Sequence, residues 1–295
     1  MKPILYLFLT ASLLSACVPG QPFTDTNPYR IAEGGRPWVI AHGGAKALFP
    51  ENTLLAFEGA WAIGVDALEI DLQLTRDGVL ICHHDDDIDG MSDGTGLLLD
   101  LDYADLAPYN FGHDFQALDG SYPYRDTLIP APQLEEVLQR FPDAQFIVEL
   151  KNRGESGRKA AEVLRNLIAR YDLYDRIIVA SFHDETLDYF REQTNDQVLL
   201  SSAESETEDF VFSGLSGMEF LYRPGAVAVQ IPTSSAGINL ASSRIVASAH
   251  RRDMAVHYWT INDKEEMRNL IGLGADGLIT DRPDLMWEVL REMGF

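Results

Sequence analysis

The stretch that decides the fold runs from residue 66 to residue 84 and reads DALEIDLQLTRDGVLICHH. It contains two apolar runs, 66–74 and 79–83, which are joined only by the four residues 75–78. Parallel strands need a crossover of about a dozen residues or more. We therefore expect the two runs to form an antiparallel hairpin with Thr75 opposite Val79, a register that places Asp71 opposite His83.

Seven further strand-type runs alternate along the chain with amphipathic, helix-type stretches. The strand-type runs are 38–41, 145–150, 176–180, 197–200, 226–230, 254–260 and 276–279. The helix-type stretches are 52–62, 133–140, 156–171, 184–193, 240–251, 264–272 and 284–293. Such alternation is typical of parallel strands joined by helices, in a closed barrel or in an open sheet. Because the second run of the hairpin lies off the ring, eight strands remain, and we predict an α/β fold, an irregular (β/α)₈ TIM-type barrel.

The same pattern gives the domain plan. A barrel domain is expected over 37–295, since α/β barrels use about 250 residues for one core. Region 86–130 has no clear periodicity and is rich in Asp, Gly, Tyr and Pro. We expect it to be an inserted loop module over the strand ends, where barrel enzymes carry their chemistry.

The N-terminal residues have the pattern of a secretion signal. Lys2 precedes an apolar stretch, 4–14, which is too short to span a bilayer as a stable helix. The residues that follow, Leu-Ser-Ala-Cys at 14–17, resemble a bacterial lipobox, in which the cysteine becomes the lipidated N-terminus. We therefore expect a lipoprotein signal peptide over 1–16, lipidation at Cys17 and a tether over 17–36. This predicts an extracytoplasmic protein, lipid-anchored to the cell membrane or the outer membrane.

The charge of the chain restricts its partners. With 23 Lys and Arg against 46 Asp and Glu, the net charge is −23. No basic stripe is available to neutralise a phosphate backbone, so we expect no nucleic-acid partner. An acidic protein that acts on an anionic substrate needs local compensation, usually a metal ion. The sequence leaves the oligomeric state open.

Acidic side chains interrupt apolar strands at three positions. Glu69 and Asp71 are two residues apart in one strand and share a face, and Glu149 and Lys151 repeat that spacing. Buried carboxylates inside barrel strands are costly unless they hold a cation. Glu69, Asp71 and Glu149 therefore predict a site for one divalent cation, Ca²⁺ or Mg²⁺, which both prefer oxygen ligands.

Histidines follow two of the expected strands. His42 comes directly after the run 38–41, and His84 ends the hairpin. Imidazole titrates near neutral pH, so this pair suits general acid–base catalysis. Together with the cation and Lys151, the pair indicates phosphate-ester chemistry. His83 faces the opposite way to His84 and is expected to be outward or structural, and His257 is expected to be a core histidine.

Several ordered motifs resemble the glycerophosphodiester phosphodiesterase family. They are IAHGG at 40–44, PENTLLAF at 50–57, the block 64–85, IP at 129–130 with LEEVL at 134–138, VELK at 148–151, SF at 181–182, WTIN at 259–262 and DGLITDRP at 276–283. The match covers about residues 38–290. Several ordered blocks are much more specific than a single motif.

This resemblance implies hydrolysis of glycerophosphodiesters to an alcohol and glycerol 3-phosphate, with either water or the substrate's own hydroxyl as nucleophile. It implies His42 and His84 as catalytic acid and base, and Glu69, Asp71 and Glu149 as ligands of a divalent metal. The resemblance further implies contact of Lys151 with the phosphate, a place for Trp259 in the substrate pocket, and support of the first loop by Glu51 and Asn52.

One position departs from the family pattern. The family usually has Arg directly after the first histidine, and here that residue is Gly43. Lys46 could replace the phosphate contact of the arginine, or backbone N–H groups of the Gly43–Gly44 turn could bind phosphate as a nest. The departure also keeps other substrates open: a lysophospholipid, as in a lysophospholipase D, or a wall-polymer phosphodiester. A non-catalytic surface binding protein is a further, weaker alternative.

Overall fold

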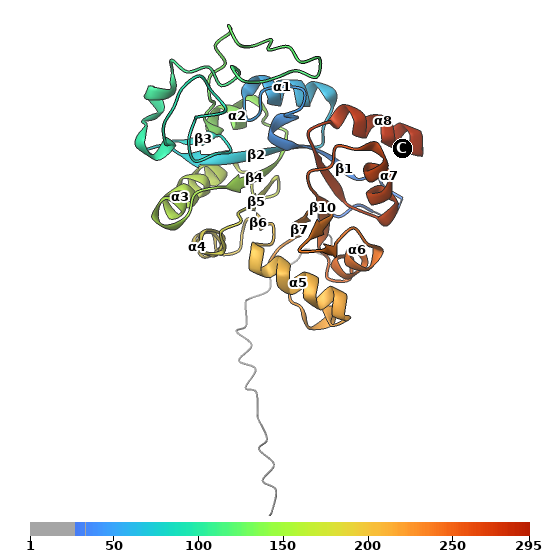
Figure 1. The fold of residues 1–295 in the computed structure, drawn as a ribbon. Helices are drawn as coiled ribbons and strands as arrows, with labels where there is room; N and C mark the ends of the chain where they lie inside the picture. The colour runs from blue at the N-terminus through green and yellow to red at the C-terminus, as the bar shows by residue number, and fades with distance from the viewer. Residues whose placement is uncertain (1–26, 33) are drawn as a thin grey trace, which may run out of the picture.

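The computed structural model describes residues 27–32 and 34–295 (Figure 1). The predicted signal peptide, Cys17 and most of the predicted tether lie outside the described residues. Eight parallel strands form the central ring, and their order is β6-β5-β4-β2-β1-β11-β10-β7. Their bounds are β1 Trp38–Ala41, β2 Ala67–Leu74, β4 Gln145–Leu150, β5 Ile177–Ala180, β6 Leu199–Leu200, β7 Ala228–Ile231, β10 Ala255–Tyr258 and β11 Gly277–Thr280.

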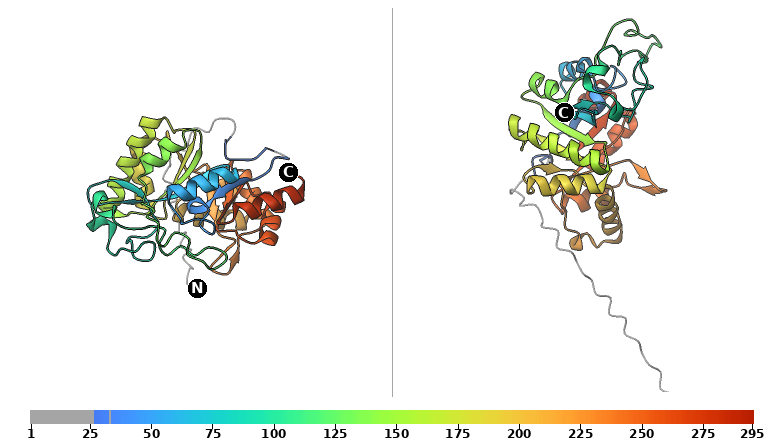
Figure 2. Two further views of the ribbon diagram at one scale, coloured as in Figure 1. Left: turned by 90° about the horizontal axis from the view of Figure 1, so that it is seen from above. Right: turned by 90° about the vertical axis from the view of Figure 1, so that its left-hand side faces the viewer.

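The two ends of the strand order meet between β6 and β7. Ser201 pairs with Ala228 in a parallel bridge, and the Ser202 N–H donates to the Ala228 carbonyl at 2.9 Å. The predicted TIM-type barrel is therefore confirmed as a nearly closed ring. Helices surround the ring: α1 Leu54–Ile63, α2 Leu134–Arg140, α3 Gly154–Tyr171, α4 Asp184–Thr194, α5 Glu204–Ser216, α6 Ser243–His250, α7 Lys264–Leu273 and α8 Pro283–Met293 (Figures 1 and 2).

The predicted hairpin is present with the predicted register. Strand β3, Leu80–Cys82, runs antiparallel to β2, and Leu74 pairs with Leu80. The His83 N–H donates to the Asp71 carbonyl at 3.0 Å, as the register with Thr75 opposite Val79 requires. A second, small hairpin follows β7 and consists of β8 Ser234–Ser235 and β9 Ile238–Asn239.

Alternate residues of each strand belong to two different hydrophobic cores. The residues that face into the barrel form one buried cluster, with members Ile40, Ala67, Ile147, Ile178, Ala228, Ala255 and Ile279. Their neighbours along the strands, such as Val39 and Leu68, pack against the helices in a larger outer cluster. This period of two means that a polar residue in an inward position faces the barrel interior.

Residues at the end of the predicted tether pack against the barrel. Tyr29 is fully buried in the inner cluster, where its ring lies 4.9 Å from that of Trp38. The Asn27 side chain donates to the carbonyls of Val227 and Asp253. The described residues 27–29 are thus part of the folded domain, which extends further toward the N-terminus than the predicted boundary at residue 37.

The predicted insertion has its own small core beside β3. Ile81, Ile88, Leu98, Leu106 and Phe111 are buried together there, and two short 3₁₀ turns, η2 Leu98–Asp100 and η3 Tyr103–Leu106, lie within the segment. Figure 1 shows the segment as irregular chain around β3, in teal and green. Among the described residues, no helix has the length and apolar character needed to cross a membrane.

Candidate active site

A cavity of about 850 Å³ opens at the carboxyl ends of the barrel strands. Its lining includes seven residues that the sequence singled out: His42, Glu69, Asp71, His84, Glu149, Lys151 and Trp259. Glu69, Asp71 and Glu149 lie in β2 and β4, and the other four lie one or two residues after β1, β3, β4 and β10. The parallel ring brings these strand ends together, although the residues are up to 217 positions apart (259 − 42).

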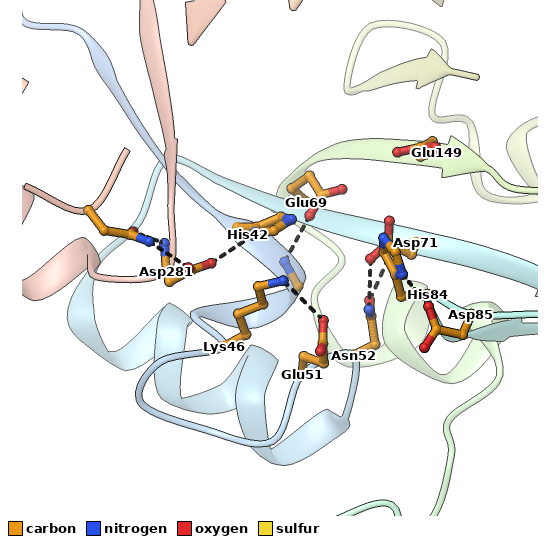
Figure 3. Close-up of polar contacts among 12 residues, drawn as sticks. His42, Lys46, Glu51, Asn52, Glu69, Asp71, His84, Asp85, Glu149 and Asp281 are labelled. Atoms are coloured by element: carbon orange, nitrogen blue, oxygen red, sulfur yellow. Dashed lines mark hydrogen bonds and ion pairs between the residues drawn. The ribbon is translucent and has the colours of Figure 1, made fainter. Parts of the chain in front are cut away.

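Three carboxylates meet on one side of this cavity (Figure 3). Asp71 of β2 pairs in register with Glu149 of β4, and Glu69 lies one inward position before Asp71. One oxygen atom from each of the three lies within 4.8 Å of the other two. Glu69 and Asp71 are only 6% and 1% exposed. Such a buried set of hard oxygen donors can hold a divalent cation.

Lys151 balances part of this charge. Its Nζ lies 2.9 Å from Asp71 Oδ1 and 2.9 Å from Glu149 Oε2. Burial disfavours the charged ammonium, but the two carboxylates outweigh that cost and raise the pKa of Lys151. Burial alone would raise the pKa of Asp71, yet Lys151, His84 and Asn52 hold it below its usual range.

Glu69 lacks an ion-pair contact to this lysine. Burial, and then the charge of Asp71, raise the pKa of Glu69, and burial also raises that of Glu149. Among the described residues, three carboxylates therefore face one ammonium, and two of the three carry an electrostatic penalty. A bound divalent cation would relieve both penalties, so the donor set fits such an ion in number, chemistry and charge.

The first loop supports the carboxylates. Asn52 donates from its side-chain amide to Asp71 Oδ2 at 2.9 Å, and its Oδ1 accepts from the Asp71 N–H at 3.1 Å. The Gly43 N–H donates to Glu69 Oε2 at 2.8 Å. Asn52 thus lies where a supporting residue was predicted. The Gly43 N–H of the Gly43–Gly44 turn is thus engaged by Glu69. Binding of phosphate by this turn stays a prediction.

Each pocket histidine is paired with an aspartate through Nδ1. His42 Nδ1 lies 2.7 Å from Asp281 Oδ1, and His84 Nδ1 lies 2.7 Å from Asp85 Oδ1. The Nε2 atom of each ring is the one left to meet a ligand. Burial disfavours the charged ring of His42, but Asp281 and Glu69 outweigh it and raise the pKa of His42.

Lys46 and Glu51 both belong to the first loop, which connects β1 to α1. Lys46 Nζ is 3.7 Å from Glu51 Oε2, and neither residue belongs to the cavity lining (Figure 3). A role for Lys46 in place of the missing arginine stays a prediction. His83 is buried, as a structural histidine should be: its Nε2 pairs with the Asp87 carbonyl at 2.7 Å.

Two residues of the site were not assigned a role from the sequence. Asp281 orients His42, and the Asn262 side-chain amide donates to Asp281 Oδ2 at 2.6 Å. Asp281 follows β11 two positions after the inward residue Ile279. That spacing is the same signal that identified Glu69 with Asp71, and it could have identified Asp281.

Comparison with known proteins gives consistent results. Residues 42–285 match the glycerophosphoryl diester phosphodiesterase family. A glycerophosphodiester phosphodiesterase of Bacillus altitudinis is 29% identical over 262 residues, which are 86% of this chain and 98% of the relative. One from Bacillus subtilis is 28% identical and covers 98% of both chains.

Solved structures share the fold. A crystal structure described as a putative glycerophosphoryl diester phosphodiesterase from Silicibacter pomeroyi superposes with a TM-score of 0.73 at 22% identity, covering 90% of this chain and 97% of that one. An Oleispira antarctica phosphodiesterase, solved with the product sn-glycerol-3-phosphate, gives a TM-score of 0.68 at 20% identity, covering 87% of this chain and 97% of the other.

Proposed function

Because the chain belongs to the glycerophosphoryl diester phosphodiesterase family, we propose that it hydrolyses glycerophosphodiesters to an alcohol and glycerol 3-phosphate, with one divalent cation and a histidine acid–base pair. The observation that carries this proposal is the arrangement of two His–Asp pairs and three clustered carboxylates, two of them buried, around one cavity. The names of the relatives, and the product bound by the Oleispira antarctica enzyme, support the same substrate class.

Glu69, Asp71 and Glu149 would hold the cation, either Ca²⁺ or Mg²⁺. When bound, such an ion neutralises charge on phosphoryl oxygens and polarises the phosphorus centre. Lys151 supplies a permanent positive charge at the same edge of the cavity. These cationic groups would offset the net charge of −23, which otherwise repels an anionic substrate.

The two histidines would divide the proton transfers. Asp281 and Glu69 favour the protonated form of His42, which suits a general acid that donates to the leaving oxygen. His84, paired with Asp85, would then accept the proton of the nucleophile through Nε2. Trp259 would form part of the wall against the substrate, since it lines the same cavity as the carboxylates.

The proposal includes a location. We propose that the protein is anchored outside the cytoplasm through lipid on Cys17, on the basis of the residues at 14–17. Mass spectrometry of the mature N-terminus tests this: a diacylglycerol-modified Cys17 is expected, and a mature chain that begins at an unmodified residue contradicts it.

The test of the reaction is release of glycerol 3-phosphate from glycerophosphocholine by the full chain in detergent, with Ca²⁺, with Mg²⁺ and with EDTA. We expect one metal to support turnover and EDTA to abolish it. Removing either histidine by His42→Ala or His84→Ala should lower kcat about 10²- to 10⁴-fold. Glu69→Ala should abolish the metal dependence along with most of the activity.

The insertion provides a matched control for the histidine variants. His113 is followed by Asp114 and pairs with it at 2.9 Å through Nδ1, as His84 pairs with Asp85, but it does not line the cavity. His113→Ala should keep wild-type kcat. Full activity in EDTA, or equal activity of His84→Ala and His113→Ala, would contradict the proposed function.

A further inference from the structure

The cavity extends well beyond the catalytic side chains. About 850 Å³ lies near the upper end of the range for small-molecule sites, roughly 300–1,000 Å³, and exceeds what a glycerol phosphate needs. The catalytic residues line one part of it. The rest is bounded by α5, by the segment from Ile231 to Leu240 that includes the β8–β9 hairpin, and by the residues after β5.

Helix α5 presents one stripe of side chains to this space. The residues that line the cavity are Glu204, Thr207, Glu208, Val211, Phe212, Leu215 and Ser216, a spacing of three and four that defines a single helical face. The first half of this stripe is polar and the second half is apolar. Phe212, in the apolar half, is 69% exposed, although it is a large aromatic residue.

The segment around the β8–β9 hairpin lines the same cavity with mostly apolar residues, Ser235 being the polar one. Ile231, Pro232, Ile238 and Leu240 line the cavity from the segment around the β8–β9 hairpin, and Ile238 is 43% exposed. Phe182 and Trp259 line the same cavity as the groove and the catalytic side chains, and their rings lie edge to face with centroids 5.9 Å apart. The apolar groove is therefore continuous with the site that would hold the phosphodiester.

We propose that the groove between α5 and the β8–β9 hairpin binds the acyl chain of a lysophospholipid, whose phosphodiester lies at Glu69, Asp71 and Glu149. This inference rests on the proposed function and names its substrate class. In the net reaction, one water adds its oxygen to phosphorus, the bond between phosphorus and the headgroup oxygen breaks, and the headgroup alcohol leaves with a proton. The products are a lysophosphatidate and the free alcohol.

A flexible apolar chain suits this groove better than a polar headgroup does. Beyond the polar first half of the α5 stripe, Val211, Phe212 and Leu215 offer aliphatic and aromatic side chains, and a sugar or a second phosphate beside them would lose hydrogen bonds to water without replacement. Each methylene that enters the groove should strengthen binding about fourfold. A chain-length series therefore measures how far the groove extends from the phosphate.

The experiment compares kcat/KM for glycerophosphocholine with that for its 1-acyl derivatives of four, six and eight carbons, all as monomers and with the full chain. We expect kcat/KM to rise by at least 30-fold from no chain to eight carbons. Phe212→Glu places a charge in the groove at an exposed position, where folding should be unaffected. It should reduce the ratio of octanoyl to unacylated turnover at least tenfold.

Phe220→Glu is the matched control, because Phe220 is also 69% exposed but does not line the cavity. It lies in the short turn η4, Glu219–Leu221, which follows α5. This variant should keep the wild-type dependence on chain length. If kcat/KM of the wild type did not change with chain length, or if Phe212→Glu and Phe220→Glu reduced that dependence equally, the proposal that the groove binds an acyl chain would be wrong.

A binding measurement tests the groove independently of catalysis. Calorimetric titration with alkylphosphocholines of six, eight and ten carbons needs no turnover, so it tests the groove even if glycerophosphocholine is not hydrolysed. The Kd should fall about fourfold per methylene in the wild type and in Phe220→Glu, but not in Phe212→Glu. An unchanged Kd across the series contradicts the inference, whereas tightening without any hydrolysis would contradict only the proposed function.

Discussion

At the residue scale, neighbouring polar side chains fix the orientation of the His42 ring. Asp281 holds the His42 ring through Nδ1, and Asn262 in turn holds Asp281. Burial would raise the pKa of Asp281, but its bond to His42 keeps it below the usual range, so the carboxylate is charged at neutral pH. The ring orientation and the charge of His42 therefore both depend on one side chain.

We predict that Asp281→Asn lowers kcat about 10²-fold without unfolding the protein. Asp281 raises the pKa of His42, so its loss lowers that pKa, and His42 deprotonates at a lower pH. The basic limb of the pH–rate profile should move to lower pH. Asp114→Asn, which removes the partner of His113, is the control. A basic limb at its original pH would show that Asp281 does not set the protonation of His42.

Much of this site could be predicted from strand ends alone. Polar residues at inward positions of apolar strands, such as Glu69, Asp71 and Glu149, identified the carboxylate cluster because the barrel brings these ends together. Lys46 could not be placed this way. Its position depends on a loop in which Ala45 and Asn52 both have positive φ and in which its ammonium lies 3.7 Å from Glu51 Oε2.

At the element scale, glycines fix how the first loop packs on α1. Gly44 has a φ of +79°, and a Cβ there would lie 2.8 Å from Ala56 Cβ and 2.9 Å from Phe57 Cδ1. Gly64, which ends α1, has a similar φ of +93° but no heavy atom within 4 Å of such a Cβ. The two positions share the backbone strain and differ in the steric clash.

We predict that Gly44→Ala destabilises the fold by about 3 kcal/mol and Gly64→Ala by about 1 kcal/mol, since only the first adds a clash to the positive φ. Unfolding in urea measures both. Because the Gly43 N–H binds Glu69, Gly44→Ala should also weaken metal binding, whereas Gly64→Ala should leave it unchanged. Equal losses of stability would mean that the loop can move away from α1.

The elements themselves were largely predictable. The four-residue connection between 74 and 79 excluded a parallel crossover, and this alone separated eight ring strands from nine candidates. The packing of residues 27–29 was not predictable, because a short polar stretch gives no periodic signal. Its fit depends on the space left inside the barrel beside Trp38, which only the closed ring creates.

At the scale of the whole molecule, the barrel interior carries an unpaired polar group. His257 lies inward on β10, in register with Gln230 of β7, and is completely buried. Neither ring nitrogen has a hydrogen-bond partner among the described residues. His257 is thus a core histidine, as expected. Its surroundings favour the neutral ring but offer no hydrogen bond to either ring nitrogen. Burial lowers its pKa to about 4 from the ordinary value of 6.5.

This histidine should make global stability fall as the pH is lowered. Between pH 6.5 and about pH 4 the unfolded chain binds a proton at residue 257 that the folded chain does not, so protons favour unfolding in that range. From pH 7 to pH 4.5 the free energy of unfolding should decrease by about 2.5 kcal/mol because of His257 alone.

At pH 7, where the ring is neutral in both states, His257→Leu should be neutral or stabilising, because it removes two buried polar atoms that lack partners. Urea unfolding of wild type and His257→Leu at pH 7, 6, 5 and 4.5 separates this effect from the carboxylates, whose contributions cancel in the difference. The wild-type free energy of unfolding should fall below that of the variant as the pH decreases, and two parallel curves would show that the folded protein accommodates a charged imidazole at this position.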